Sequence, residues 1–324
     1  MDSTPLQKAR RIRRWATIAL IAIFAIIFFS LNIYPSYSSG DDPKLSEISH
    51  LTKNIPYCTG QNGQVLDLYT PSSTDDYPDD DGAPYPLVIY VHGGGWRKGD
   101  KQNTLIEYYG AELSKEGFAI ASVNYRLAPK FRYPAQNDDV ACAIKTLAEK
   151  ADQYKLDTQN VILFGDSAGS LLASSYALSA RDKPVTIRGV ISFYGTTDLV
   201  SQLKRTKHNP NAYAYLGTRD TDIARAASPL FQPITNIPPP FLFFHGTKDT
   251  IVSIDQALNL YHRIAAYRPS SRFVRINNAP HGFGDSSNTK PSSSDIRRAL
   301  ALFALRHIGH LNEAEADEAI SSLQ

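Results

Sequence analysis

The sequence is poor in cysteine and in net charge. Only two of its 324 residues are cysteines, which excludes a small fold held together by disulfides. The formal net charge is only +2, and the excess of positive charge lies within residues 1–40. The remainder therefore lacks the basic surface by which proteins bind nucleic acid, and we expect no such partner. Hydrophobic residues make up 42% of the chain, enough to bury a substantial core.

Residues 15–34 contain no charged side chain and are dominated by Ile, Phe, Ala and Leu. A helix of this length spans about 30 Å, the thickness of the hydrocarbon core of a bilayer. Trp15 and Tyr34 bracket the stretch, and a basic cluster precedes it. The positive-inside rule then predicts a single-pass signal anchor with a cytoplasmic N-terminus and the rest of the chain on the other side of the membrane. The alternative is a cleaved signal peptide and a secreted protein, but no Ala-x-Ala site follows the stretch.

The rest of the chain shows no internal repeat and no second domain boundary. We expect a basic N-terminus at 1–14, a transmembrane segment at 15–34, a linker at 35–53, one α/β domain at 54–310 and an acidic C-terminal tail at 311–324. An aspartate-rich loop at 72–85 could hold a cation. Its spacing fits no calcium-binding pattern, however, and we predict no metal site.

Within this domain, apolar strand-like runs alternate with helix-like runs. Strands are expected at 64–70, 85–93, 118–126, 160–165, 187–195, 240–246 and 271–277, and helices at 103–117, 138–151, 167–180, 254–267 and 293–310. This alternation is typical of a mostly parallel sheet with helices on both faces. In such sheets ligands bind at the carboxyl ends of the strands, so a functional residue is expected directly after a strand.

Ser167 stands in the run Gly-Asp-Ser-Ala-Gly, where a predicted strand turns into a helix. At such a turn, Gly-x-Ser-x-Gly forms the elbow in which the serine has a strained backbone and points into the cleft. The helix N-terminus would favour developing negative charge there. An ordinary tight turn with a helix cap is the alternative. We take Ser167 as the candidate nucleophile.

Three successive glycines follow His92 at the end of another predicted strand. Because glycines have no side chains, their N–H groups can face a substrate oxygen. His-Gly-Gly-Gly is also the oxyanion-hole sequence of lipases and esterases, although a flexible loop is the alternative. Two of the glycine amides, together with the amide of Ala168, could hold a tetrahedral oxyanion. His92 itself is expected to brace the loop.

A nucleophilic serine needs a base, and the base needs an acid that orients it. In α/β-hydrolases the acid and then the histidine follow the serine along the chain. Asp249 follows the predicted strand 240–246, and His281 follows the next strand. The other histidines include His245, His262, His307 and His310, of which His262 and His307 lie within predicted helices. His281 is favoured as the base. Asp198 also follows a strand and remains an alternative acid, although the strand order favours Asp249.

The motifs HGGGW, VNYRLAP, YPAQNDD, GDSAG, ASPL, HGTKD and HGF together resemble the hormone-sensitive-lipase-like carboxylesterases of the α/β-hydrolase superfamily, over roughly residues 54–309. The resemblance implies an α/β-hydrolase fold, with Ser167 as nucleophile, Asp249 and His281 as its partners, and Gly94, Gly95 and Ala168 as oxyanion donors. Trp96 and Lys130 depart from residues usual in that family. The segment before the first strand is too short for the family's helical cap, so the chain is more similar to the smaller feruloyl and acetyl-xylan esterase-like branch.

Three features leave alternatives open. The long connection at 196–239 is either a lid that selects substrates or a packed crossover. Trp96 either shapes the substrate pocket or has an ordinary packing role. Cys58 and Cys142 lie on separate segments, and we expect them to remain unpaired because nothing in the sequence places them within bonding distance.

The predicted function is a serine carboxylesterase that hydrolyses a small-molecule ester through an acyl-enzyme intermediate, without a cofactor. An amidase or peptidase would use the same three side chains and is the alternative among enzymes. A non-catalytic hydrolase fold used as a scaffold is the alternative outside enzymes. The sequence contains a candidate nucleophile, base, acid and oxyanion donors, and their joint presence argues against a non-catalytic scaffold.

Overall fold

The computed structural model describes residues 43–72, 83–179, 182–205, 210–283 and 289–323. The predicted basic N-terminus and transmembrane segment lie outside the described residues, as do the first part of the linker and most of the aspartate-rich loop. None of the helices within the described ranges combines the length and apolar character that a membrane crossing requires.

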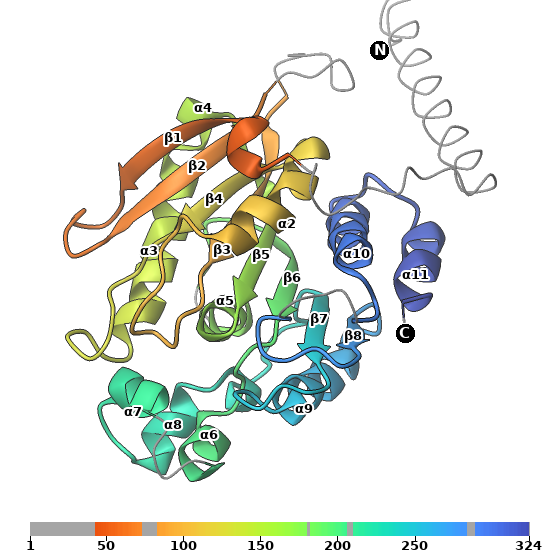
Figure 1. The fold of residues 1–324 in the computed structure, drawn as a ribbon. Coiled ribbons are helices and arrows are strands. Elements are labelled where there is room, and N and C mark those ends of the chain that lie inside the picture. Colours follow the sequence, from red (N-terminus) through yellow and green to blue (C-terminus); the bar gives the residue numbers. More distant parts are fainter. Residues whose placement is uncertain (1–42, 73–82, 180–181, 206–209, 284–288, 324) are drawn as a thin grey trace, which may run out of the picture. The chain divides into compact units, whose positions relative to one another are not determined.

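A sheet of eight strands forms the centre of the described domain, in the order β1-β2-β4-β3-β5-β6-β7-β8 (Figure 1). The strands are β1 (Ser49–Pro56), β2 (Val65–Pro71), β3 (Tyr85–Val91), β4 (Ala119–Val123), β5 (Leu156–Asp166), β6 (Ile187–Phe193), β7 (Phe241–Gly246) and β8 (Arg272–Ile276). The pairs β1–β2 and β2–β4 are antiparallel, and the other neighbours are parallel. This confirms the predicted α/β-hydrolase fold with a mostly parallel sheet.

Helices cover both faces of the sheet. The helices of one face are α3 (Ala135–Glu149), α5 (Ala168–Leu178) and α9 (Ile254–Ala265), and those of the other are α2 (Thr104–Lys115) and α10 (Ser293–His307). Successive side chains of a strand point to opposite faces, so β3 sends Leu87 and Ile89 into the first core and Val88 into the second. Burial on both faces explains why these strands read as continuous apolar runs.

Both ends of the described domain extend beyond the predicted boundaries. β1 occupies residues that were assigned to the linker, and the preceding 3₁₀ turn η1 (Leu45–Glu47) buries Leu45 completely. Most side chains of β1 are exposed or half-buried because it is an edge strand, which makes its sequence resemble a linker. At the other end, α11 (Glu313–Ser321) buries Ile320 in the same core as α10, so this segment is a packed helix.

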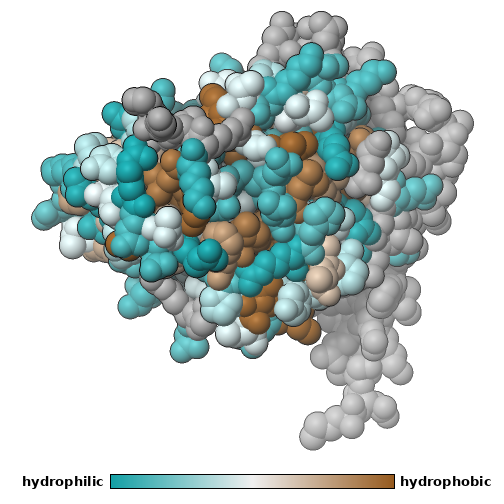
Figure 2. Space-filling view, turned by 90° about the horizontal axis from the view of Figure 1, so that it is seen from below, coloured by the Kyte–Doolittle hydropathy of each residue, from teal (hydrophilic) through white to brown (hydrophobic). Residues whose placement is uncertain are grey.

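The segment 196–239 between β6 and β7 folds into short helices. They are α6 (Leu199–Arg205), α7 (Pro210–Leu216), α8 (Thr221–Ala226) and the 3₁₀ turn η2 (Pro229–Phe231). These helices lie together at the lower side of Figure 1. Figure 2 views the molecule from that side and shows apolar side chains interspersed with hydrophilic ones. Tyr213 and Ile223 of this segment are among the large apolar side chains that remain exposed.

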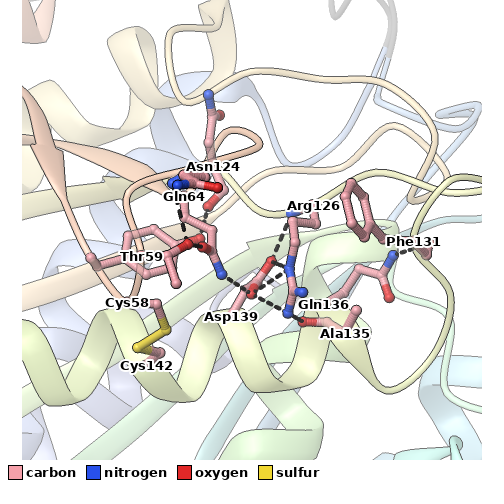
Figure 3. Close-up of polar contacts among 12 residues, drawn as sticks. Cys58, Thr59, Gln64, Asn124, Arg126, Phe131, Ala135, Gln136, Asp139 and Cys142 are labelled. Carbon is pink, nitrogen blue, oxygen red and sulfur yellow. Dashed lines mark hydrogen bonds and ion pairs between the residues drawn. A yellow bond between two sulfur atoms is a disulfide. The ribbon is translucent and has the colours of Figure 1, made fainter.

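The prediction that Cys58 and Cys142 stay unpaired is wrong. They form a disulfide with a Cα–Cα distance of 5.9 Å, which joins the β1–β2 loop to α3 (Figure 3). Next to it, the buried Asp139 of α3 accepts a hydrogen bond from Gln64 Nε2 at 2.8 Å. It also forms an ion pair with Arg126, whose Nη2 lies 2.7 Å from Oδ1 of Asp139. This polar network holds the loop against α3 and brings the two thiols together. Neither contact can be read from the spacing of the cysteines.

Candidate active site

Ser167 lies at the turn between β5 and α5 with a positive φ of 49° and a ψ of −112°, a combination that is rare for residues other than glycine. The two flanking glycines allow this turn. A Cβ on Gly165 would lie 2.6 Å from the backbone of Gly169, and a Cβ on Gly169 would lie 2.0 Å from the carbonyl oxygen of Val91. The glycines of the motif are therefore required by close backbone approach, and the strained serine projects from the strand end.

The three residues that were predicted to act together are joined by a chain of hydrogen bonds. Ser167 Oγ lies 3.0 Å from Nε2 of His281, and Nδ1 of His281 lies 2.7 Å from Oδ2 of Asp249. An ionised carboxylate can only accept, so Nδ1 carries the proton. Nε2 is then free to accept the hydroxyl proton of Ser167. The side chain of Asp249 is fully buried, and that of His281 is 17% exposed.

The carboxylate of Asp249 is held by backbone as well as side-chain donors. Its Oδ1 accepts the amide N–H groups of Ile251 and Val252, both at 2.9 Å. Burial by itself would raise the pKa of Asp249, but hydrogen bonds from His245, His281 and Val252 and the nearby charge of His281 bring the pKa below its ordinary value. The carboxylate is thus ionised in the working range of a histidine base.

Asp198, the alternative acid, has a different role. Its Oδ1 accepts the amides of Val200 at 2.8 Å and Ser201 at 3.0 Å, which caps the first turn of α6. Among the described residues, no hydrogen bond joins it to His281. Those same residues include no group of three or more His, Cys, Asp or Glu side chains that could hold a metal ion.

The glycine loop after β3 turns sharply beside the elbow. Gly94 has φ 107° and Gly95 has φ 62°, values that favour glycine. A Cβ on Gly94 would lie 2.1 Å from the carbonyl oxygen of Lys98. Within the described part of the chain, the backbone amides of Gly94, Gly95 and Ala168 donate to no protein acceptor. Three amides next to a serine hydroxyl are therefore available to an oxygen of a bound molecule.

Sequence reasoning missed the function of Asp166 within the Gly-Asp-Ser-Ala-Gly motif. Its Oδ1 accepts the amide of Gly93 at 2.8 Å and the hydroxyl of Tyr90 at 2.7 Å. The first of these hydrogen bonds ties the elbow to the glycine loop. Burial raises the pKa of the Asp166 carboxyl, and the hydrogen bonds from Tyr90 and Gly93 oppose that shift. The neighbouring Ser167 was the only signal that could have pointed to it.

His92 braces the glycine loop from inside, as its position suggested. Its Nδ1 lies 2.7 Å from the carbonyl oxygen of Gly93, and its ring stacks on Tyr125 with centroids 4.4 Å apart. The hydroxyl of Tyr125 donates to the carbonyl oxygen of His92. Burial lowers the pKa of His92 to about 4, so the imidazole is neutral at physiological pH.

Trp96 connects the glycine loop to the segment 196–239. Its side chain is buried and stacks on Tyr215 of α7 with ring centroids 4.5 Å apart and an interplanar angle of 17°. Next to it, a Cβ on Gly95 would lie 2.6 Å from the side chain of Asn211, also in α7. These contacts support the packing role that the sequence left open for Trp96, and they place α7 directly against the glycine loop.

Comparison with known proteins agrees with this geometry. The model of the BD-FAE family matches residues 66–264. The chain belongs to the BD-FAE family. Esterase LipC of Mycobacterium tuberculosis is 28% identical over 243 residues, which cover 68% of this chain and 58% of the relative. Ethyl acetate hydrolase of Pseudomonas putida is 32% identical over 146 residues, 43% of each chain. The chain thus spans less than two thirds of the length of these curated relatives.

Solved structures with the same fold include two esterases. A truncated form of a carbohydrate esterase from gut microbiota has a TM-score of 0.66 and 20% identity, and the match covers 84% of this chain and 99% of that one. The hyperthermophilic esterase of Pyrobaculum calidifontis has a TM-score of 0.61 and 25% identity, with 80% of this chain and 85% of that one covered. The predicted resemblance to the hormone-sensitive-lipase-like carboxylesterases is confirmed, as is the greater similarity to their smaller feruloyl and acetyl-xylan esterase-like branch.

Proposed function

We propose that this protein is a serine carboxylesterase that hydrolyses small-molecule carboxylic esters through an acyl-enzyme intermediate. The observation that carries the proposal is the hydrogen-bonded chain from Asp249 through His281 to Ser167. A serine on a strained elbow, a base within hydrogen-bond reach and a buried acid behind the base are the parts that nucleophilic acyl transfer requires. The relatives named as esterases support the same reaction class.

In the first half-reaction, Nε2 of His281 takes the hydroxyl proton of Ser167 as Oγ attacks the ester carbonyl carbon. The carbonyl π-electrons move onto oxygen to give a tetrahedral oxyanion. When this oxyanion collapses, the bond to the alcohol breaks and the His281 imidazolium donates its proton to the leaving alkoxide. The ionised Asp249 holds the imidazole in the reactive tautomer and stabilises the imidazolium. Water then attacks the acyl-enzyme by the same route and releases the acid.

The oxyanion would be held by the amides of Gly94, Gly95 and Ala168, which have no acceptor among the described residues. Such donors act on charge that exists only in the transition state and its intermediate. Each is typically worth about 3–4 kcal/mol of transition-state stabilisation. No cofactor is part of this mechanism.

An amidase or peptidase would use the same three side chains, and the geometry alone fits both reaction classes. The names of the relatives favour esters. A direct comparison separates them: p-nitrophenyl acetate should be hydrolysed, and p-nitroacetanilide should be hydrolysed far more slowly. Faster cleavage of the anilide would make the amidase the better assignment.

The test of the proposal is Ser167→Ala in the full chain. We expect it to abolish hydrolysis of p-nitrophenyl acetate and labelling by a fluorophosphonate probe. The matched control is Ser179→Ala at the other end of α5, where the hydroxyl donates to the carbonyl oxygen of Tyr176 and, among the described residues, makes no other hydrogen bond. This control should keep wild-type activity. Full activity in a folded Ser167→Ala protein would refute the assignment.

The proposed location is a membrane, with residues 15–34 as an uncleaved single-pass anchor, the N-terminus cytoplasmic and the hydrolase domain on the other side. The lack of charge in this stretch and the basic cluster before it support the proposal. A secreted protein released by cleavage is the alternative.

A further inference from the structure

A second histidine contacts the carboxylate that orients His281. His245 lies near the end of β7, and its side chain is completely buried. Its Nε2 lies 3.3 Å from Oδ2 of Asp249 and 3.0 Å from the carbonyl oxygen of Val252. Oδ2 is the same oxygen that Nδ1 of His281 approaches at 2.7 Å. The two histidines therefore flank one carboxylate oxygen.

The contacts of His245 determine its tautomer. A carbonyl oxygen can only accept, so Nε2 carries a proton, which it donates to the carbonyl of Val252 while the N–H group also lies 3.3 Å from Asp249 Oδ2. Nδ1 is buried and has no hydrogen-bond partner in the described structure. A proton on Nδ1 would leave a buried donor of an imidazolium unsatisfied. The donor of His245 is thus Nε2.

With the N–H group of His245 counted, each oxygen of the Asp249 carboxylate faces two donors. Oδ1 accepts from the amides of Ile251 and Val252, and Oδ2 accepts from His281 and lies 3.3 Å from Nε2 of His245, which also helps to lower the pKa of Asp249. Donors on both oxygens prevent the carboxylate from rotating about its Cβ–Cγ bond. The direction of the Oδ2 lone pair toward Nδ1 of His281 is then fixed before a substrate binds.

We propose that His245 is a positioning residue of the hydrolytic reaction, which fixes Oδ2 of Asp249 and through it the ring of His281. This inference rests on the proposed function for its kinetic consequences. A role in packing alone would be better served by an apolar side chain of similar volume, because the imidazole leaves Nδ1 buried without a partner. The imidazole provides a hydrogen-bond donor at Nε2, which an apolar side chain lacks.

Two amide variants differ only in how far the donor reaches. In His245→Gln the side-chain nitrogen comes near the position of Nε2, whereas in His245→Asn it comes near that of Nδ1 and cannot reach Asp249. We expect the asparagine variant to lose about 10- to 100-fold in kcat with KM nearly unchanged, and the glutamine variant to stay within about threefold of wild type. His245→Met, apolar and similar in length, should match the asparagine variant.

A measurement without substrate separates this inference from the proposed function. The proton between His281 Nδ1 and Asp249 Oδ2 should give a downfield ¹H NMR resonance in the folded full-length protein. We expect it to be retained in His245→Gln and shifted or lost in His245→Asn. Wild-type protein that fails to hydrolyse any ester would refute the function but leave this test intact. A resonance unchanged in folded His245→Asn, or equal kinetic damage in the Gln and Asn variants, would overturn the positioning role.

Discussion

The carboxylate of Asp166 accepts the backbone amide of Gly93 at 2.8 Å, and this hydrogen bond joins the elbow of Ser167 to the glycine loop. We expect Asp166→Ala to lower kcat/KM for p-nitrophenyl acetate by about 10- to 100-fold, because the loop that carries the oxyanion donors loses its fixed distance to the serine. Asp166→Asn keeps the Oδ1 acceptor and should stay close to wild type. An alanine variant with wild-type kinetics would show that the loop is held by other contacts.

The assignment of Asp249 as the acid can be tested by comparison with Asp198, the alternative acid in the sequence. Asp249→Asn should lower kcat by about 10²- to 10⁴-fold with little change in KM, because an amide in place of the carboxylate favours the wrong tautomer of His281. Asp198→Asn should lose less than about tenfold, since asparagine caps a helix as well as aspartate does. Both are measured at saturating substrate, with circular dichroism to verify folding. Greater damage in a folded Asp198→Asn protein would contradict the assignment of the acid.

The positions of Ser167, Asp249 and His281 could be predicted because each follows a strand whose apolar run is plain in the sequence. Parallel strands bring their carboxyl ends to one edge of the sheet, so residues that directly follow these strands lie close to one another. The fold class was predictable for the same reason. Alternating strands and helices with both faces of the sheet buried leave few other arrangements.

Contacts through space between loops could not be predicted. The pairing of Cys58 with Cys142 depends on the buried Asp139 network, and the role of Asp166 depends on how closely the glycine loop approaches the elbow. His245 could not be singled out among the histidines of the sequence, because its contact with Asp249 is set by the turn after β7. β1 was missed because an exposed edge strand has no continuous apolar run.

The disulfide should contribute to stability by restricting the unfolded chain. Its cysteines are 84 residues apart, a long loop. We expect Cys58→Ser/Cys142→Ser to lower the free energy of unfolding by about 2–5 kcal/mol. A reducing agent should destabilise the wild-type protein by a similar amount in urea denaturation and leave the double variant unchanged. Equal effects of reductant on both proteins would show that the bond does not contribute to stability in solution.

The proposed membrane anchor predicts how the protein fractionates. Full-length protein should remain in the membrane pellet after washing with alkaline carbonate, which releases peripheral proteins but not spanning helices. Deletion of residues 1–42 should move all ester hydrolysis to the soluble fraction. In intact cells, externally added protease should digest the hydrolase domain once any outer barrier is removed. A mature N-terminus near Ser39 would show cleavage, and a protected domain would contradict the orientation.

The burial of His92 beneath the glycine loop predicts a pH dependence of stability. Its pKa is lowered by burial from 6.5 to about 4. Between these values the unfolded chain binds a proton that the native protein excludes. The contribution of His92 is therefore complete above about pH 6.5 and falls as the pH drops toward 4, by up to about 3 kcal/mol.

His92→Asn isolates this contribution, because the asparagine amide lies near the position of Nδ1 and can still donate to the carbonyl oxygen of Gly93. We expect the free energy of unfolding of this variant, from urea denaturation, to fall less than that of wild type between pH 6.5 and 4. The difference between the two curves should approach about 3 kcal/mol at pH 4 relative to pH 7. His50→Asn, at an exposed position, serves as the control and should follow the wild-type curve. Parallel curves for wild type and His92→Asn would mean that the native protein admits a proton at His92 as readily as the unfolded chain does.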